Sequence, residues 1–192
     1  MAEFGIVKSN YFSFEKYKQL VDKYYENDPR EINFQNRVIL TLLDKIFIND
    51  EKIWIVDVST QFKNRESEQH TREMYANDYT PDLLIVKKWK YNNINKPSED
   101  YLAVVEIKSP KLDPIRKNNN HTSKEVDNYI KIGRKVILTD CFEWRFYGFG
   151  ENPKSFTLHD ENDWVMEEVK NPEFIVNEMG FPKKKKRIKG LE

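Results

Sequence analysis

The sequence predicts an α/β fold, with a mixed central β-sheet of four to five strands and helices on both faces. Two observations lead to this prediction. Apolar residues near the start recur with the helical period, and short runs rich in β-branched residues follow, interrupted by one further helical segment. The 192 residues are enough to close the core of one domain. We expect strands at residues 53–60, 82–89, 101–108, 135–140 and 144–149, with a further candidate at 156–164.

Three segments account for the helices. Residues 13–26 are amphipathic, and their apolar stripe would cover the sheet. The stripe consists of Phe14, Tyr17, Leu20, Val21 and Tyr24. A second helix is expected to run to about residue 47, with Asp28 as its N-cap and Pro29 at the first helical position. Thr122 and Glu125 have the spacing of a capping box and would open the third helix.

Charged residues lie within the apolar strand segments, where an uncompensated charge is costly. Glu106 and Lys108 are two residues apart, so both project from the same face of a strand. If 82–89 and 101–108 form an antiparallel hairpin, pairing Asp82 with Glu106 or Lys108 puts the midpoint at residue 94 or 95. The turn-forming stretch at 92–97 covers that midpoint, so this register is self-consistent. Two carboxylates and a lysine would then converge at one end of the hairpin.

This convergence favours a metal-dependent site over an incidental one. Two carboxylates with open coordination positions suit Mg²⁺, for which Mn²⁺ is an expected substitute. Lys108 would orient or deprotonate a water and stabilise charge on a phosphate. The simpler alternatives are that Asp82 only starts a strand, and that Glu106 and Lys108 form a surface ion pair of little energetic value.

The same residues resemble the signature of the PD-(D/E)XK nuclease superfamily, read here as Pro81-Asp82 followed by Glu106-Ile107-Lys108. Over residues 28–149 the chain is similar to the nuclease domain of type I restriction enzyme motor subunits. That domain has an acid-bearing first helix, here with Glu31, and a Gln-x-x-x-Tyr helix before a strand pair. Glu125 stands at the position of the Gln, and Tyr129 at that of the Tyr.

The resemblance implies a restriction-endonuclease-like core and a Mg²⁺-dependent endonuclease acting on DNA in a restriction-modification or related defence system. Asp82 and Glu106 would bind the metal, with Glu31 as a further candidate ligand, and Lys108 would complete the catalytic set. DNA would be the main partner, and a motor, specificity or methyltransferase domain or subunit would supply specificity. The rival from another class is a non-catalytic nucleic-acid-binding or assembly module, and RNA cleavage would use the same side chains.

Several of these residues have a second interpretation. Glu31 and Glu125 are each spaced as the acid of a capping box, with Asp28 and Thr122 respectively. Tyr129 either packs on the sheet or contacts nucleic acid. Three cations in the loop at 110–120 either meet phosphates or belong to a solvated loop. They are Lys111, Arg116 and Lys117.

Composition narrows the partners. Because 32 basic residues face 32 acidic ones, the net charge exerts no general attraction on DNA, and contacts must come from local patches. We expect one domain over 1–182 and a basic tail or linker over 183–192, which holds the run Lys183–Arg187. Without a long apolar stretch, the chain is expected to be cytoplasmic and to have no membrane partner, while a homodimer stays open. The single cysteine, Cys141, excludes a disulfide framework and is expected in the core or a turn.

Overall fold

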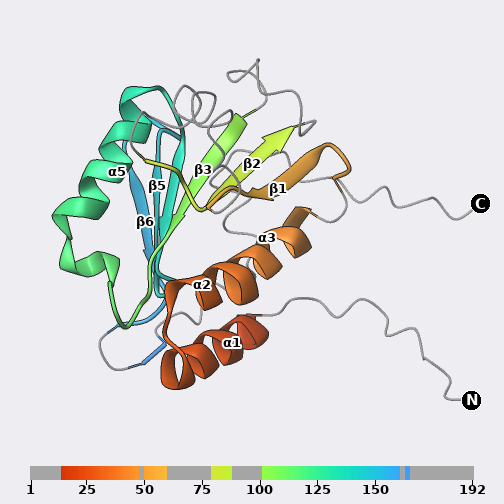
Figure 1. Cartoon of the computed structure of the whole chain (residues 1–192), viewed down its shortest axis with the longest axis vertical. Helices are drawn as coiled ribbons and strands as arrows, with labels where there is room; N and C mark the ends of the chain where they lie inside the picture. The colour runs from red at the N-terminus through yellow and green to blue at the C-terminus, as the bar shows by residue number, and fades with distance from the viewer. Residues whose placement is uncertain (1–13, 48–49, 60–78, 88–100, 161–162, 165–192) are drawn as a thin grey trace, which may run out of the picture.

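A computed structural model describes residues 14–47, 50–59, 79–87, 101–160 and 163–164. Within this part of the chain the protein is an α/β structure with a six-stranded mixed sheet between two helical layers (Figure 1). The expected strand at 156–164 falls only partly on the observed one. The basic run Lys183–Arg187 and the domain boundary at residue 182 lie outside the described residues. No helix of the described part is long and apolar enough to cross a bilayer.

The strands follow one another across the sheet in chain order. Only the contact between β3 and β4 is parallel, and the other four are antiparallel. The strands are β1 (Ile53–Asp57), β2 (Leu83–Lys87), β3 (Tyr101–Ile107), β4 (Val136–Thr139), β5 (Glu143–Tyr147) and β6 (Lys154–Thr157). The predicted count of four to five is therefore wrong by one strand. Strand β6 was predicted at the wrong position because three of its four residues are exposed, so its sequence has no pattern of apolar residues.

The side chains of β2 and β3, the two strands of the predicted hairpin, point alternately to the two faces of the sheet and so belong to two separate parts of the core. The side chains of one set pack with the helices of the first fifty residues. The other set packs with the helix between β3 and β4. The first set is Leu83, Ile85, Ala103, Val105 and Ile107, and the second is Leu84, Val86 and Val104. Glu106 belongs by alternation to the second face, as predicted from its spacing.

The first helical layer begins with α1 (Phe14–Asn27), which buries Tyr17 and Val21. The Tyr17 hydroxyl donates a hydrogen bond of 2.7 Å to the carbonyl of Cys141 and accepts one from the Trp144 indole at 3.3 Å. These bonds tie α1 to the turn between β4 and β5. Cys141 is buried in that turn at φ 71°, which confirms the core-or-turn interpretation.

The second helix starts later than predicted and is not uniform. Arg30 is the N-cap of α2 (Glu31–Asn33), and no side chain caps it. Asp28 is not the cap, because its carboxylate is held by the Arg30 guanidinium at 2.6 Å. A π-helical segment at Phe34–Ile39 and α3 (Leu40–Phe47) complete the layer.

The second layer is the crossover from β3 to β4. It contains a 3-10 turn at Ile115–Lys117 and then α5 (Asn120–Lys131). Asn119 is the N-cap, since its side-chain oxygen accepts from the backbone N–H of His121 at 2.9 Å. The capping-box prediction for Thr122 and Glu125 is therefore wrong, because Thr122 already lies inside the first turn. Glu125 is thus available for another contact.

Candidate functional site

The predicted meeting of Asp82 with the end of β3 occurs in the structure. Leu83 pairs with Val105, which puts Asp82 opposite Glu106 and the hairpin midpoint at residue 94, as the sequence predicts. The Asp82 N–H donates to the carbonyl of Val105 at 3.1 Å, and its carboxylate accepts from the N–H of Ile107 at 2.7 Å. A hydrogen-bonded backbone therefore fixes the Asp82 side chain beside β3.

Lys108 and Glu106 form a direct ion pair, with 2.6 Å between Nζ and Oε1. Glu106 is 4% exposed and Lys108 is 7% exposed, so the interpretation as a surface pair is wrong. The backbone N–H of Lys108 donates to the carbonyl of Thr139 at 2.9 Å, which continues the parallel pairing with β4 and holds the residue at the strand end.

Helix α5 adds two side chains that face β3. Glu125 and Tyr129 are one turn apart on the helix, and both are buried. Glu125 Oε2 lies 3.0 Å from Lys108 Nζ, and the Tyr129 hydroxyl donates to Glu106 Oε2 at 3.3 Å. Tyr129 is fully buried, as in the packing alternative. We call Asp82, Glu106, Lys108, Glu125 and Tyr129, together with Glu31, the carboxylate–lysine site.

Glu31 reaches this site electrostatically from α2. Burial raises its pKa, the positive charge of Lys108 lowers it, and the negative charges of Glu125 and Asp113 raise it further. Since α2 has no side-chain cap, Glu31 is not the acid of a capping box. The sequence suggested both a capping role and a metal-binding role for Glu31. The structure supports only its closeness to the other charges of the site.

The titration of the site reflects buried negative charge. Burial first, and then the charge of Glu31, raise the pKa of Asp82 to about 7. Burial and the charge of Asp82 raise the pKa of Glu106 well above its ordinary value. Burial alone would lower the pKa of Lys108, but the carboxylates of Glu106 and Glu125 outweigh it and raise that pKa. Lys108 therefore remains an ammonium at neutral pH, which suits it to orienting a water or stabilising charge better than to removing a proton.

The donor chemistry fits a hard divalent cation held by few protein ligands. Among the described residues, no group of three or more His, Cys, Asp or Glu side chains is arranged to hold a metal ion. Mg²⁺ commonly uses only one or two carboxylates and completes its shell with water and substrate phosphates. Asp82, whose carboxylate accepts from the N–H of Ile107, and Glu106, whose pKa is raised by the charge of Asp82, provide such a set.

The three loop cations have different surroundings. Lys111 donates to the carbonyl of Tyr25 at 3.1 Å and lies 4.9 Å from the centre of the Tyr25 ring, so its ammonium contacts the end of α1. Arg116 and Lys117 are exposed on the 3-10 turn. All three residues are exposed, and Lys111 differs from the other two in that its ammonium is engaged by the end of α1.

Two polar residues near the site had not been singled out. His121 Nδ1 lies 3.3 Å from Glu125 Oε1, and their spacing of four residues on a helix was the available signal. Gln35 is buried in the π-helical segment and donates to the Ser59 hydroxyl at 3.1 Å. Gln35 stands four residues after Glu31, but a polar residue at that spacing does not by itself identify a site.

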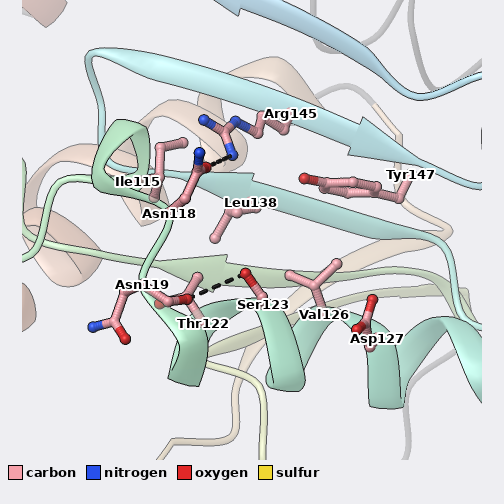
Figure 2. A pocket seen from close by; sticks show the side chains of 10 residues that line it. All are labelled: Ile115, Asn118, Asn119, Thr122, Ser123, Val126, Asp127, Leu138, Arg145 and Tyr147. Carbon is pink, nitrogen blue, oxygen red and sulfur yellow. Dashed lines mark hydrogen bonds between the residues drawn. The ribbon is translucent and has the colours of Figure 1, made fainter.

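A second polar region lies where α5 faces β4 and β5. Figure 2 shows a cleft of about 110 Å³ between this helix and β5, with Leu138 at its floor. Arg145 borders it, donates to the Asn118 side chain at 3.2 Å, and pairs with Glu143 at 2.6 Å. We call this region the Arg145 cleft. Its other lining residues are Ile115, Asn119, Thr122, Ser123, Val126, Asp127 and Tyr147.

The fold and the site together define an α/β protein with a buried cluster of carboxylates around one lysine at the C-terminal end of the interior strand β3. Comparisons of the chain with protein-family models, with curated proteins and with solved structures gave no match. The function must therefore be argued from the site.

Proposed function

We propose that this protein is a metal-dependent endonuclease of the PD-(D/E)XK type that hydrolyses phosphodiester bonds of DNA. One observation supports this most strongly. Around the single ammonium of Lys108, the buried or half-buried carboxylates of Asp82, Glu106, Glu125 and Glu31 interact with one another and raise several of their own pKa values. A buried excess of negative charge is costly unless a cation is bound.

The residues divide into two roles. Asp82 and Glu106 would hold Mg²⁺ or Mn²⁺ between β2 and β3, and the bound ion would supply charge neutralisation at the scissile phosphate. The ammonium of Lys108, fixed 2.6 Å from Glu106, would orient the attacking water and stabilise the developing negative charge. Tyr129 supports Glu106 from the side of α5 through its hydroxyl.

The finer assignment rests on the order of these residues along the chain. An acid before β2, an acid-x-Lys ending β3, and a helix followed by a strand pair are the parts that resemble a restriction-endonuclease-like core. That resemblance supports DNA as substrate, a restriction-modification or related defence setting, and a separate domain or subunit for specificity. The exposed Arg116 and Lys117 are candidates for contacts with the phosphate backbone.

Nicking of supercoiled plasmid tests the proposal. With Mg²⁺ or Mn²⁺ we expect the wild type to nick and linearise the plasmid, and Asp82→Ala or Lys108→Ala to lose about 10²-fold or more of the rate. Asp127→Asn is the matched control, since it removes a carboxylate from the exposed side of α5 and should keep the wild-type rate. Wild-type protein that binds DNA in a gel shift but leaves it intact at high concentration would instead identify a binding or assembly module. Structured and single-stranded RNA, tested in parallel, separate the third alternative.

A further inference from the structure

Glu125 belongs to the carboxylate–lysine site but has no role so far. It does not cap its helix, and the metal is assigned to Asp82 and Glu106. Glu125 is 8% exposed, and its two oxygens have different partners. Oε1 lies 3.3 Å from the exposed His121, whereas the buried Oε2 lies 3.0 Å from Lys108 Nζ. Within the described part of the chain this buried oxygen accepts no hydrogen bond of good geometry, and it is held by the ion pair with Lys108.

Lys108 needs an anchor other than Glu106. The lysine side chain is a flexible stem of four methylene groups, and contact with a single carboxylate leaves its ammonium free to rotate. Glu106 contacts the ammonium at 2.6 Å, but it is also one of the two carboxylates assigned to a divalent cation, so the same oxygens serve two positive charges. Glu125 comes from α5 instead of the hairpin, and it approaches the ammonium from a separate element.

We propose that Glu125 is a positioning residue that clamps the Lys108 ammonium at the end of β3 independently of Glu106. The inference rests on the proposed function only in assigning Lys108 to the reaction. The clamp itself is a contact between two side chains. Because Glu125 approaches from α5, whose Val126 and Tyr129 are buried against side chains of the sheet, the clamp keeps its place when Glu106 turns toward another cation.

The clamp differs from a purely structural ion pair in a measurable way. A structural pair would affect folding alone, whereas a clamp fixes one ammonium group and thereby the rate of the step in which that group takes part. Glu125→Gln keeps the volume of the side chain and one acceptor oxygen while removing its charge. Asp127→Asn removes the same charge two residues away, from an exposed side chain that lines the Arg145 cleft.

Spectra of the lysine ammonium groups test the clamp in the 192-residue chain without metal or DNA. In ¹H–¹⁵N spectra, with the Lys108 resonance assigned by its loss in Lys108→Arg, we expect slow exchange with water in the wild type. Glu125→Gln should speed that exchange about tenfold, and Asp127→Asn should leave it unchanged. Should Glu125→Gln fail to fold, Glu106→Gln supplies the second arm, because Glu125 alone should then keep the Lys108 resonance observable. A wild-type resonance already lost to exchange, or one lost in Glu106→Gln, would overturn the inference.

Binding of Mn²⁺ and plasmid kinetics complete the test. For Glu125→Gln we expect Mn²⁺ affinity within twofold of wild type by calorimetry, a kcat about tenfold lower, and an unchanged KM for plasmid. Mn²⁺ binding weakened tenfold would make Glu125 a metal ligand and overturn the positioning role, as would an unchanged kcat in a variant whose ammonium exchange is fast. A wild type that never nicks DNA would end the proposed nuclease function, while the metal-free ammonium spectra would still support or overturn the clamp.

Discussion

The two polar regions on the α5 face of the sheet differ in how their charges are balanced. The strand register puts Glu106 of β3, Leu138 of β4 and Arg145 of β5 in one row across the sheet. Since neighbouring strands are about 4.8 Å apart, the Cα atoms of Glu106 and Arg145 are about 10 Å apart. The apolar side chain of Leu138 lies between the two regions.

At the border of the Arg145 cleft, Arg145 and Glu143 form a pair that remains in contact with solvent. The side chains of Arg145 and Glu143 are 23% and 16% exposed, and their 2.6 Å contact pairs one charge with one charge. In the carboxylate–lysine site several carboxylates surround one ammonium, and the side chains of Lys108 and Glu106 are only 8% and 5% exposed. The difference suggests a rule for this protein: a ligand is expected where buried carboxylates outnumber the cations beside them, and not simply where there is a cavity.

The largest expected effect that sharpens this comparison is on stability against pH. The pKa of Asp82 is about 7 in the folded protein against an ordinary value of 3.8. The folded state therefore binds more protons than the unfolded state between these values, so stability is highest at low pH and is lost as the pH rises toward 7. In metal-free protein the free energy of unfolding should fall by roughly 4 kcal/mol from pH 4 to pH 8 through this group.

Urea denaturation in EDTA across that range measures the effect. Asp82→Asn should reduce the slope, because it removes one titrating carboxyl and keeps an oxygen that can accept from Ile107, while Glu106 continues to titrate. Arg145→Met should leave the slope as it is. Equal slopes in wild type and Asp82→Asn would show that the Asp82 carboxyl is not held protonated by its surroundings.

Addition of a divalent ion should give the next largest effect. If Mg²⁺ binds at Asp82 and Glu106, a concentration ten times the dissociation constant should stabilise the folded protein by about 1.4 kcal/mol at pH 8. Thermal unfolding with increasing MgCl₂, at ionic strength held constant with KCl, measures it. We expect Glu106→Gln to abolish the gain and Arg145→Met to keep it, and an equal gain in all three proteins would locate the ion elsewhere.

The smallest effect should come from the matched pair itself. Because Arg145 and Glu143 remain in contact with solvent, their interaction should contribute about 1 kcal/mol or less. A double-mutant cycle with Arg145→Met and Glu143→Gln in urea measures the coupling energy. A coupling above roughly 2 kcal/mol would mean that the Arg145 cleft is electrostatically as demanding as the carboxylate–lysine site, and the contrast between the regions would fail.

Much of the fold was readable from local patterns. The apolar stripe at 13–26 predicted α1 to within one residue at each end, and the apolar runs at 82–89 and 101–108 predicted β2 and β3. Strand β6 was placed incorrectly because Lys154–Thr157 is mostly exposed and has no buried face. The predicted start of the second helix was wrong because the Asp28 carboxylate is bound by the Arg30 guanidinium instead of capping the helix, a contact that no local propensity describes.

The core of the site was readable because a hairpin couples sequence distance to spatial register. In antiparallel strands the sum of paired residue numbers stays constant over a regular stretch, so Asp82 and Glu106 could be brought together from numbering and a turn signal alone. Their alternation with apolar neighbours further predicted that Glu106 and Lys108 would share a face.

The tertiary structure decided what surrounds that core. Whether Glu125 caps its own helix or binds Lys108 depends on where α5 lies over the sheet, and that placement follows from packing of Val126 and Tyr129 against β-strand side chains far away in sequence. The same holds for the approach of Glu31 from α2. Local periodicity is set by the backbone and can be read from sequence, whereas the packing of one element on another sums many weak contacts and sets the burial, and thus the pKa values, of the charges that it brings together.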